Sequence, residues 1–235
     1  MKLPLTLLLA LHAVSTSSSS PTSTSPNTNR PKYRISPIDG SKIALPTKPQ
    51  LDFQDKEIGV LIHFNIATYL SIDGCNNVPE LVPKTSLFDP ENLNTNQWME
   101  SISTLGAKYA TLVAKHNCGF TLWPSDISFE TKGGKTVPYN YTIAQSPVKG
   151  EDVVRMFVDS AKEHGVGHGF YYSVVVNNFL NVQDSEVRDG DSAPGQVGIT
   201  DGTYNEVVLK QLEELWSNYG DLTEVSSTCS RLGLC

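Results

Sequence analysis

The chain has 235 residues, 39% of them hydrophobic and 18% charged, a composition typical of a globular protein large enough to form one buried core. Its formal net charge of −7 argues against binding along a nucleic-acid backbone, because that binding requires clustered lysine and arginine. No nucleic-acid partner is therefore expected, and composition alone selects no activity.

The first 34 residues are expected to lie outside the folded domain. Lys2, the apolar run Leu3–Leu11 and the small residues after it are typical of a signal peptide, assigned here to residues 1–17. Residues 18–34 are rich in serine, threonine and proline and are expected to form a flexible leader. Later apolar runs are shorter than the roughly 20 residues that a transmembrane helix needs. The protein is therefore expected to be secreted and extracellular, with no membrane partner.

Three nearly continuous apolar runs, at residues 57–64, 107–114 and 166–176, indicate strands that are buried on both faces. Polar and aromatic residues stand at or near the carboxyl end of each run. Because the strands are expected to be parallel, these residues would meet at one edge of the sheet. They include His63 after the first run and His116 after the second, with Tyr171 in the third.

Each predicted strand is followed by a helical pattern. Asn94, with Gln97 three residues later, is expected to cap the first helix, Asp152 opens the second, and Thr203 is expected to cap the third. Strand and helix alternate as in parallel βαβ units, so residues 35–225 are expected to form one α/β domain. No glycine-rich phosphate loop follows the first strand, which favours a (β/α)-barrel over a nucleotide-binding doubly wound sheet.

Several sequence blocks coincide with these strand ends. They are Ile62-His63-Phe64, Ala114-Lys115-His116-Asn117-Cys118-Gly119-Phe120, Leu122-Trp123-Pro124-Ser125 and Gly169-Phe170-Tyr171-Tyr172-Ser173. In this order and spacing the blocks resemble the α-L-fucosidases of glycoside hydrolase family 29, from about Glu57 to Val225. The resemblance implies a retaining exo-glycosidase that removes terminal α-L-fucose from fucosylated glycans. It also implies that the chain forms the N-terminal part of a (β/α) TIM-like barrel, about its first three to four strands.

The resemblance further implies which residues bind the sugar. His63, His116 and Tyr171 match family residues that hydrogen-bond the fucose hydroxyls, and Asn117 stands where members often have a second histidine. A neutral imidazole suits this role because it donates through one nitrogen and accepts through the other. The two histidines could instead bind zinc, but a third ligand at recognisable spacing is missing, so no metal or other cofactor is expected.

Retaining glycosidases need two carboxylates about 5 Å apart, one as nucleophile and one as acid/base. In the family, the strand that matches Val225 continues to the nucleophilic aspartate, and the acid/base lies farther along. Here a divergent tail, residues 226–235, replaces that segment, so no catalytic residue is assigned. We expect a truncated, inactive glycosidase. The alternatives are a noncatalytic product that binds sugar weakly and a doubly wound binding protein unrelated to glycosidases.

Three further features stay open at the level of sequence. Cys75 and Cys118 both follow predicted strands and could form a disulfide in an oxidising compartment. Trp123 could stack against a sugar or pack in the core. Asn140 begins an N-glycosylation acceptor, Asn-Tyr-Thr, and is expected to carry a glycan if the chain is exported.

Overall fold

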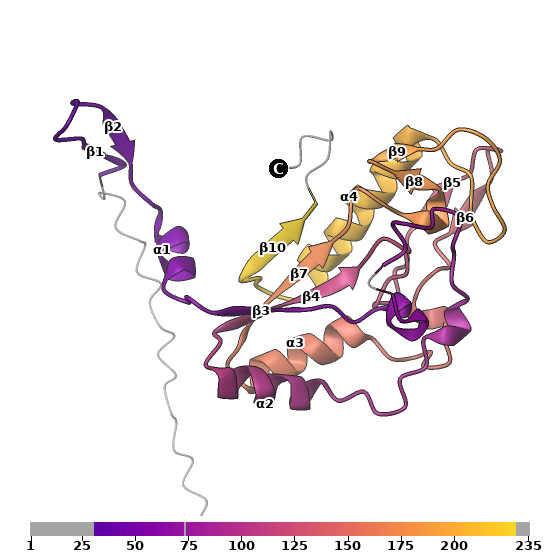
Figure 1. The fold of residues 1–235 in the computed structure, drawn as a ribbon, viewed down its shortest axis with the longest axis horizontal. Coiled ribbons are helices and arrows are strands. Elements are labelled where there is room, and N and C mark those ends of the chain that lie inside the picture. The colour runs from indigo at the N-terminus through magenta and orange to yellow at the C-terminus, as the bar shows by residue number, and fades with distance from the viewer. Residues whose placement is uncertain (1–30, 73, 229–235) are drawn as a thin grey trace, which may run out of the picture. The chain divides into compact units, whose positions relative to one another are not determined.

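The computed structural model describes residues 31–72 and 74–228 (Figure 1). The predicted signal peptide, most of the predicted leader, and residues 229–235 of the predicted tail lie outside this described part. The chain divides into two compact units, one up to Thr47 and one from Lys48 onward.

The first unit contains an antiparallel pair of short strands, β1 (Tyr33–Ile35) and β2 (Lys42–Ala44). The Lys42 ammonium lies 4.7 Å from the centre of the Tyr33 ring, a cation–π contact across the pair. Strand β1 begins at Tyr33, whereas residues 18–34 were expected to form a flexible leader. Cross-strand pairing thus extends over Tyr33 and Arg34, the last two residues of the predicted leader.

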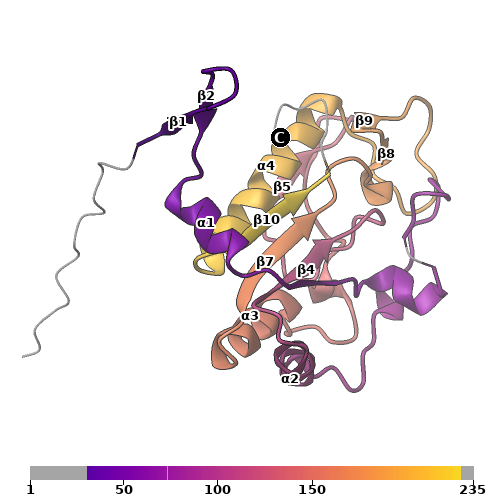
Figure 2. The same ribbon diagram turned by 60° about the vertical axis from the view of Figure 1, so that its left-hand side comes forward.

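The second unit is built on a parallel sheet with the strand order β10-β7-β4-β3. Figure 2 shows β10, β7 and β4 side by side, and Figure 1 labels β3. Its strands are β3 (Gly59–Ile62), β4 (Tyr109–Lys115), β7 (Gly167–Tyr172) and β10 (Glu224–Ser227). The predicted α/β class with a parallel sheet is confirmed. Closure into a barrel remains a prediction.

Strand β10 continues past Val225 into the first residues of the predicted divergent tail. Ser226 and Ser227 were expected to belong to a divergent tail, but they pair in parallel with Tyr171 and Tyr172. The Thr228 hydroxyl accepts hydrogen bonds from Val174 N at 3.1 Å and Val175 N at 3.3 Å. These polar residues fit because β10 is an outer strand whose side chains are half-buried or exposed, so that their hydroxyls need not be fully desolvated.

The helices of this unit are α1 (Lys48–Gln54), α2 (Thr95–Leu105), α3 (Val153–Glu163) and α4 (Asp201–Asn218). Asn94 caps α2 by accepting from Gln97 N at 3.1 Å, and Asp152 caps α3, as predicted. The cap of α4 is Thr200, not Thr203, because the Thr200 hydroxyl accepts from Thr203 N at 3.2 Å. None of the helices in the described ranges is both long and apolar enough to cross a membrane.

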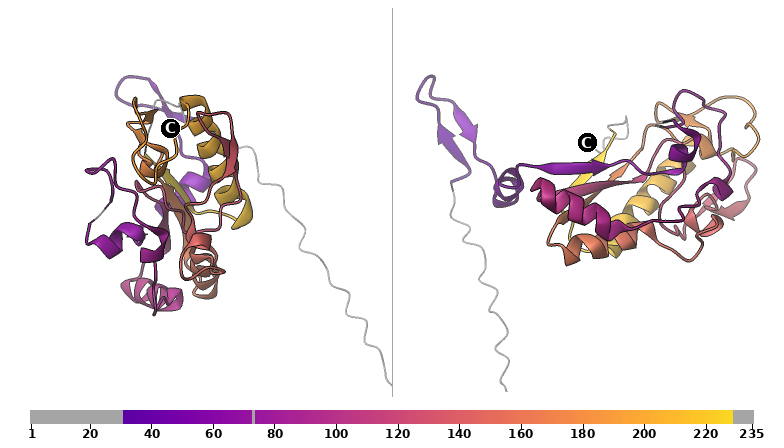
Figure 3. Two further views of the ribbon diagram at one scale, coloured as in Figure 1. Left: turned by 90° about the vertical axis from the view of Figure 1, so that its right-hand side faces the viewer. Right: turned by 60° about the horizontal axis from the view of Figure 1, so that its bottom comes forward.

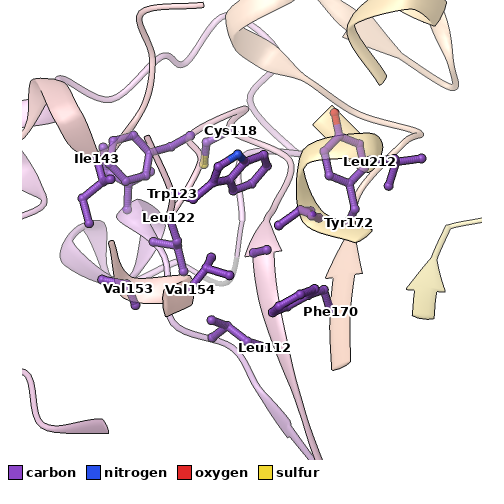
Figure 4. Close-up of a cluster of buried hydrophobic side chains, with 14 of the residues drawn as sticks. Leu112, Cys118, Leu122, Trp123, Ile143, Val153, Val154, Phe170, Tyr172 and Leu212 are labelled. Carbon is purple, nitrogen blue, oxygen red and sulfur yellow. The ribbon is translucent and has the colours of Figure 1, made fainter. Parts of the chain in front are cut away.

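The main core lies between the sheet and its helices. Helix α3 packs on β4 and β7 and lies beside α2 (Figure 3). Figure 4 shows Leu112 and Phe170 from the strands meeting Val154 from α3, all at most 1% exposed. Each such side chain contributes roughly 2 kcal/mol by leaving water. On the opposite face of the sheet, a cavity of about 230 Å³ is lined by Gly59, Val60, Leu61, Tyr109, Thr111, Glu224 and Ser226.

Short segments complete the second unit. They are the strand pairs β5 (Ser128–Glu130) with β6 (Thr136–Pro138) and β8 (Val182–Gln183) with β9 (Glu186–Val187), and the 3-10 helices η1 (Ile66–Leu70), η2 (Thr85–Leu87), η3 (Ile143–Gln145) and η4 (Asn178–Leu180).

Candidate functional site

Three aromatic rings from successive strands meet at the carboxyl end of the sheet. The ring centres of His63 and His116 are 4.5 Å apart with an interplanar angle of 86°, an edge-to-face contact. The ring centres of His116 and Tyr171 are 6.1 Å apart. His63 is exposed and the other two are partly buried. The structure therefore brings the three residues together as predicted, and sugar binding by them remains a prediction.

A bulge in β4 turns His116 toward its neighbours. Val113 pairs with Tyr171, but Lys115, not Ala114, pairs with Tyr172, so Ala114 is an extra residue in the strand. Strict alternation would place His116 on the same face as Leu112 and Ala114, under the helices. The extra residue reverses that alternation, and His116 shares a face with Tyr171 instead.

The loop after β3 packs against the ring of His116. A side chain on Gly74 would approach His116 Cε1 to 2.7 Å, so only glycine allows this loop so close to the imidazole. The next residue, Cys75, forms a disulfide with Cys118, and their Cα atoms are 4.9 Å apart. The disulfide that the sequence left open is thus formed, and it fixes the loops that follow β3 and β4 to each other.

Asn117 lies beside the three rings but already has partners in the chain. Its side-chain oxygen accepts a hydrogen bond from the Ser173 hydroxyl at 2.7 Å, and its backbone carbonyl accepts from Asn178 N at 2.9 Å. Asn117 thereby joins the end of β4 to the loop after β7. Its predicted contact with sugar is not tested by these hydrogen bonds. The sequence placed Ser173 at the end of the third strand, but no local pattern predicts that its hydroxyl bonds to Asn117.

Two charged groups of the sheet were also missed, Lys115 at this end and Glu224 nearer the amino ends of the strands. Lys115 is 0% exposed, and burial lowers the pKa of its ammonium to about 7. Glu224 begins β10, and its carboxylate accepts a hydrogen bond from the Thr111 hydroxyl inside the cavity on that face. Within residues 31–72 and 74–228, no group of three or more His, Cys, Asp or Glu side chains is placed to hold a metal ion.

Trp123 packs in the core of this chain and is not exposed for stacking against a sugar. Its side chain lies in the buried cluster of Figure 4 and is 2% exposed. Its indole Nε1 donates to Glu214 Oε2 at 2.8 Å. The same carboxylate accepts from the Ser125 hydroxyl at 2.7 Å and from Asp126 N at 2.8 Å. Helix α4 therefore holds the loop after β4 through one carboxylate and three donors.

Replacing that carboxylate with an amide tests this link. The Glu214→Gln variant is expected to lose about 1.5 kcal/mol of unfolding free energy, because its NH₂ group cannot accept from the indole or the hydroxyl. Urea denaturation followed by tryptophan fluorescence measures the change. Glu213→Gln, an exposed neighbour on α4, is the control and should leave stability within about 0.5 kcal/mol. Equal effects of the two variants would show that the Trp123 contact adds no stability.

Asn140 is exposed, whereas Tyr141 and Thr142, the next two residues of its acceptor tripeptide, are buried. Thr142 caps η3, and its hydroxyl accepts from Ala144 N at 3.1 Å. The Asn140 side chain thus lies where a glycan would project into solvent. Glycosylation of Asn140 stays a prediction.

The fold and the strand-end rings together define a class of protein. It is an α/β protein whose parallel sheet presents polar side chains at its carboxyl edge, which is where such proteins place binding and catalytic groups. The family profile named Alpha-L-fucosidase matches residues 44–225, and the chain belongs to this glycoside hydrolase family. The alternative of an unrelated doubly wound binding protein is therefore excluded.

Individual relatives agree with this assignment. A protein from rice, Oryza sativa subsp. japonica, is 30% identical over 220 residues, which are 93% of this chain and 34% of the rice protein. Alpha-L-fucosidase 1 of Arabidopsis thaliana is 29% identical over 183 residues, which are 78% of this chain and 30% of that protein. The chain thus spans about a third of the length of these two relatives.

Solved structures match the same region. The crystal structure of a glycoside hydrolase 29 family member from an unknown rumen bacterium superposes with a TM-score of 0.60 at 28% identity. The match covers 79% of this chain and 28% of the bacterial chain. The two proteins therefore share the parallel sheet and its helices, and both the superposition and the sequence identity support this relationship.

Proposed function

We propose that residues 35–225 are the N-terminal part of an α-L-fucosidase (β/α)-barrel and that its carboxyl face binds terminal α-L-fucose of fucosylated glycans. One observation carries the proposal: side chains at the ends of three parallel strands, His63, His116 and Tyr171, come together in a chain of this family. Family membership alone would not require these three residues to lie close together in this chain. Their convergence is what binding of one small ligand by all three would require.

The chemistry of these groups suits a sugar. Each imidazole can donate through one ring nitrogen and accept through the other, and the Tyr171 phenol can do both, which matches hydroxyl groups that also do both. The Asn117 amide lies beside them, its oxygen already engaged by Ser173. Aromatic ring faces next to these polar atoms would contact the apolar side of a pyranose. We assign His63, His116, Tyr171 and Asn117 to substrate binding on this basis.

We further propose that this 235-residue chain does not hydrolyse fucosides by itself. The ten residues that follow Val225 contain no aspartate or glutamate, so none of them can act as a carboxylate nucleophile. In the strand, Ser226 stands beside Tyr171, and the Thr228 hydroxyl is occupied by two backbone donors of the loop after β7. Without two carboxylates, retaining hydrolysis has neither its nucleophile nor its proton donor.

We also propose that the protein is exported. Disulfides persist in oxidising compartments, and the Cys75–Cys118 disulfide next to His116 fits that environment. The exposed Asn140 is accessible to the glycosylation machinery of the same route. Mass spectrometry of the secreted protein before and after enzymatic glycan removal would test both points, and an unmodified Asn140 in a cell-retained chain would refute them.

Titration with L-fucose tests the binding proposal. The wild-type chain is expected to bind, and His116→Ala is expected to weaken the affinity about tenfold, since one or two hydrogen bonds to the sugar are lost. Isothermal calorimetry or NMR shifts of the imidazole protons measure the affinity. His164→Ala, at the end of α3, is the control and should bind like wild type. Absence of any binding, or equal affinity for the His116 and His164 variants, would refute the proposed site.

Hydrolysis of a chromogenic aryl α-L-fucoside tests the second part. The purified chain is expected to release no more chromophore than the buffer, even at high protein concentration. If binding is present and release absent, the chain is a noncatalytic sugar binder. Robust release that disappears in His116→Ala would show instead that carboxylates elsewhere in the chain complete an active site.

A further inference from the structure

Lys115 is a fully buried cation at the end of β4. Its ammonium nitrogen donates to the carbonyl oxygen of Ser173 at 2.5 Å and to that of Val176 at 3.3 Å, and it lies 4.6 Å from the centre of the Tyr172 ring. All three partners are in β7 or in the loop after it. Within the described residues, no carboxylate lies close enough to Lys115 to form a salt bridge.

Burial of this charge opposes folding. Removing an ammonium from water without a carboxylate partner is expensive, and the pKa of Lys115 is lowered to about 7 for that reason. A methionine of similar length would fill the same space without that penalty. What the ammonium adds is therefore geometric: only a group with several donors can bind two carbonyl oxygens of one loop at once.

The two segments that Lys115 joins carry the rings of the candidate site. Lys115 is the residue after the β4 bulge and precedes His116 directly, and its backbone carbonyl accepts from Ser173 N at 3.0 Å. Tyr171 lies two residues before Ser173 in β7. The ammonium and the backbone of Lys115 thus hold the His116 segment and the Tyr171 segment at a fixed spacing. The contact between His63 and His116 has a separate support, because the Cys75–Cys118 disulfide and the packing of Gly74 on the imidazole join the loop after β3 to the end of β4.

We propose that Lys115 is a positioning residue, whose buried ammonium ties the β4 bulge to the loop after β7 and so keeps His116 and Tyr171 facing the same ligand. The identity of that ligand as fucose rests on the proposed function. The arrangement of the rings can be measured without any ligand. An experiment can therefore distinguish failure of the fucose-binding proposal from failure of the positioning role of Lys115.

The Lys115→Met variant tests this role in the full chain, with Lys108→Met, an exposed residue just before the same strand, as control. Nuclear Overhauser contacts between ring protons are the readout. In Lys115→Met the His63–His116 contact is expected to persist and the His116–Tyr171 contact to disappear. In Lys108→Met both should persist. The affinity for L-fucose should fall about tenfold in Lys115→Met and stay unchanged in Lys108→Met.

Persistence of both ring contacts in a folded Lys115→Met variant would overturn the positioning role. If wild type shows no fucose binding while the His116–Tyr171 contact is still lost in the variant, the proposed function fails and the positioning role stands. If Lys115→Met does not fold, the ¹⁵N signal of the lysine ammonium in wild type decides. Slow proton exchange with scalar coupling to the Ser173 carbonyl would support the tie, and exchange as fast as in surface lysines would refute it.

Discussion

Replacing Gly119 with alanine is expected to lower the unfolding free energy by about 4 kcal/mol or more, because two costs combine at this position. Its backbone φ of +93° is strained for a residue with a side chain. In addition, a Cβ atom would lie 2.2 Å from Asn177 Oδ1, well inside van der Waals contact. Asn177 cannot move away easily, since it is buried and also bonded to Leu180 N and the Tyr139 hydroxyl. Guanidinium denaturation of the purified variant measures the loss.

Gly150 offers a matched control for the first of these costs. Its φ is +95°, nearly that of Gly119, but no atom lies within 4 Å of the Cβ position. Gly150→Ala should therefore cost only about 1 to 2 kcal/mol. The difference between the two variants reports the steric clash alone. If they were equally destabilised, the close packing of the loop after β4 on Asn177 would be refuted.

The loop of Gly119 also sets the position of His116. Gly119 N donates to the His116 carbonyl at 3.0 Å, and the Tyr139 hydroxyl donates to the Gly119 carbonyl at 2.6 Å. A shift of this loop would move the imidazole away from Tyr171. We therefore expect any Gly119→Ala protein that remains folded to bind fucose less tightly than Gly150→Ala, if the proposed function is correct.

Most of the fold could be predicted because helix caps and apolar runs are recognised from residues that are close together in the sequence. The caps Asn94 and Asp152 bond to backbone N–H groups three residues away. The apolar runs mark the strands, and β4 is buried on both faces as predicted. The same prediction is wrong for β3, an edge strand whose Leu61 is 62% exposed. The α4 cap was misplaced because Thr200 and Thr203 both carry hydroxyls in a capping pattern. Only the geometry of the helix start decides which hydroxyl accepts.

The site was predicted less completely, and for a physical reason. Period-two alternation in β4 would turn His116 under the helices, and the bulge at Ala114 that prevents this has no signature in the sequence. The expectation that strand-end residues meet at one edge, which the family resemblance shares, placed His116 with His63 and Tyr171 where alternation alone would have failed. Lys115 gave no signal either, since its partners are carbonyl groups 58 and 61 residues away. Cysteine spacing likewise left the Cys75–Cys118 disulfide undecided.

Asn178 holds the loop that packs against His116, and removing its donors should have the other large effect on stability. Its side-chain amide nitrogen lies 2.9 Å from the Cys75 carbonyl oxygen, 2.8 Å from that of Val78 and 3.0 Å from that of Leu81. The residue is 0% exposed, so water cannot replace these bonds. Each buried acceptor that loses its donor costs roughly 1 to 3 kcal/mol.

Asn178→Asp keeps the shape and removes these donors. At pH 7 the variant is expected to lose about 4 kcal/mol of unfolding free energy, since a carboxylate would face three carbonyl oxygens. At pH 4 the loss should shrink to about 2 kcal/mol, because a protonated carboxyl can donate one hydrogen bond. The sign follows from linkage. Burial beside acceptors raises the carboxyl pKa in the folded state, so the folded protein binds more protons and its stability falls as pH rises through that range.

Asn96→Asp on α2 is the control for the charge alone. Asn96 is exposed in the first turn of that helix, where a new carboxylate faces the positive end of the helix dipole. The Asn96→Asp substitution should therefore leave the unfolding free energy unchanged at pH 7 or raise it by about 0.5 kcal/mol. Urea denaturation measures the unfolding free energy of both variants and of wild type at the two pH values. Comparison with wild type at each pH separates the effect of each substitution from the pH dependence of the protein itself. A loss in Asn178→Asp that did not change between pH 4 and pH 7 would show that the carboxyl reaches solvent. No loss at either pH would show that the disulfide holds the loop carrying Gly74 and Cys75 against His116 without help from Asn178.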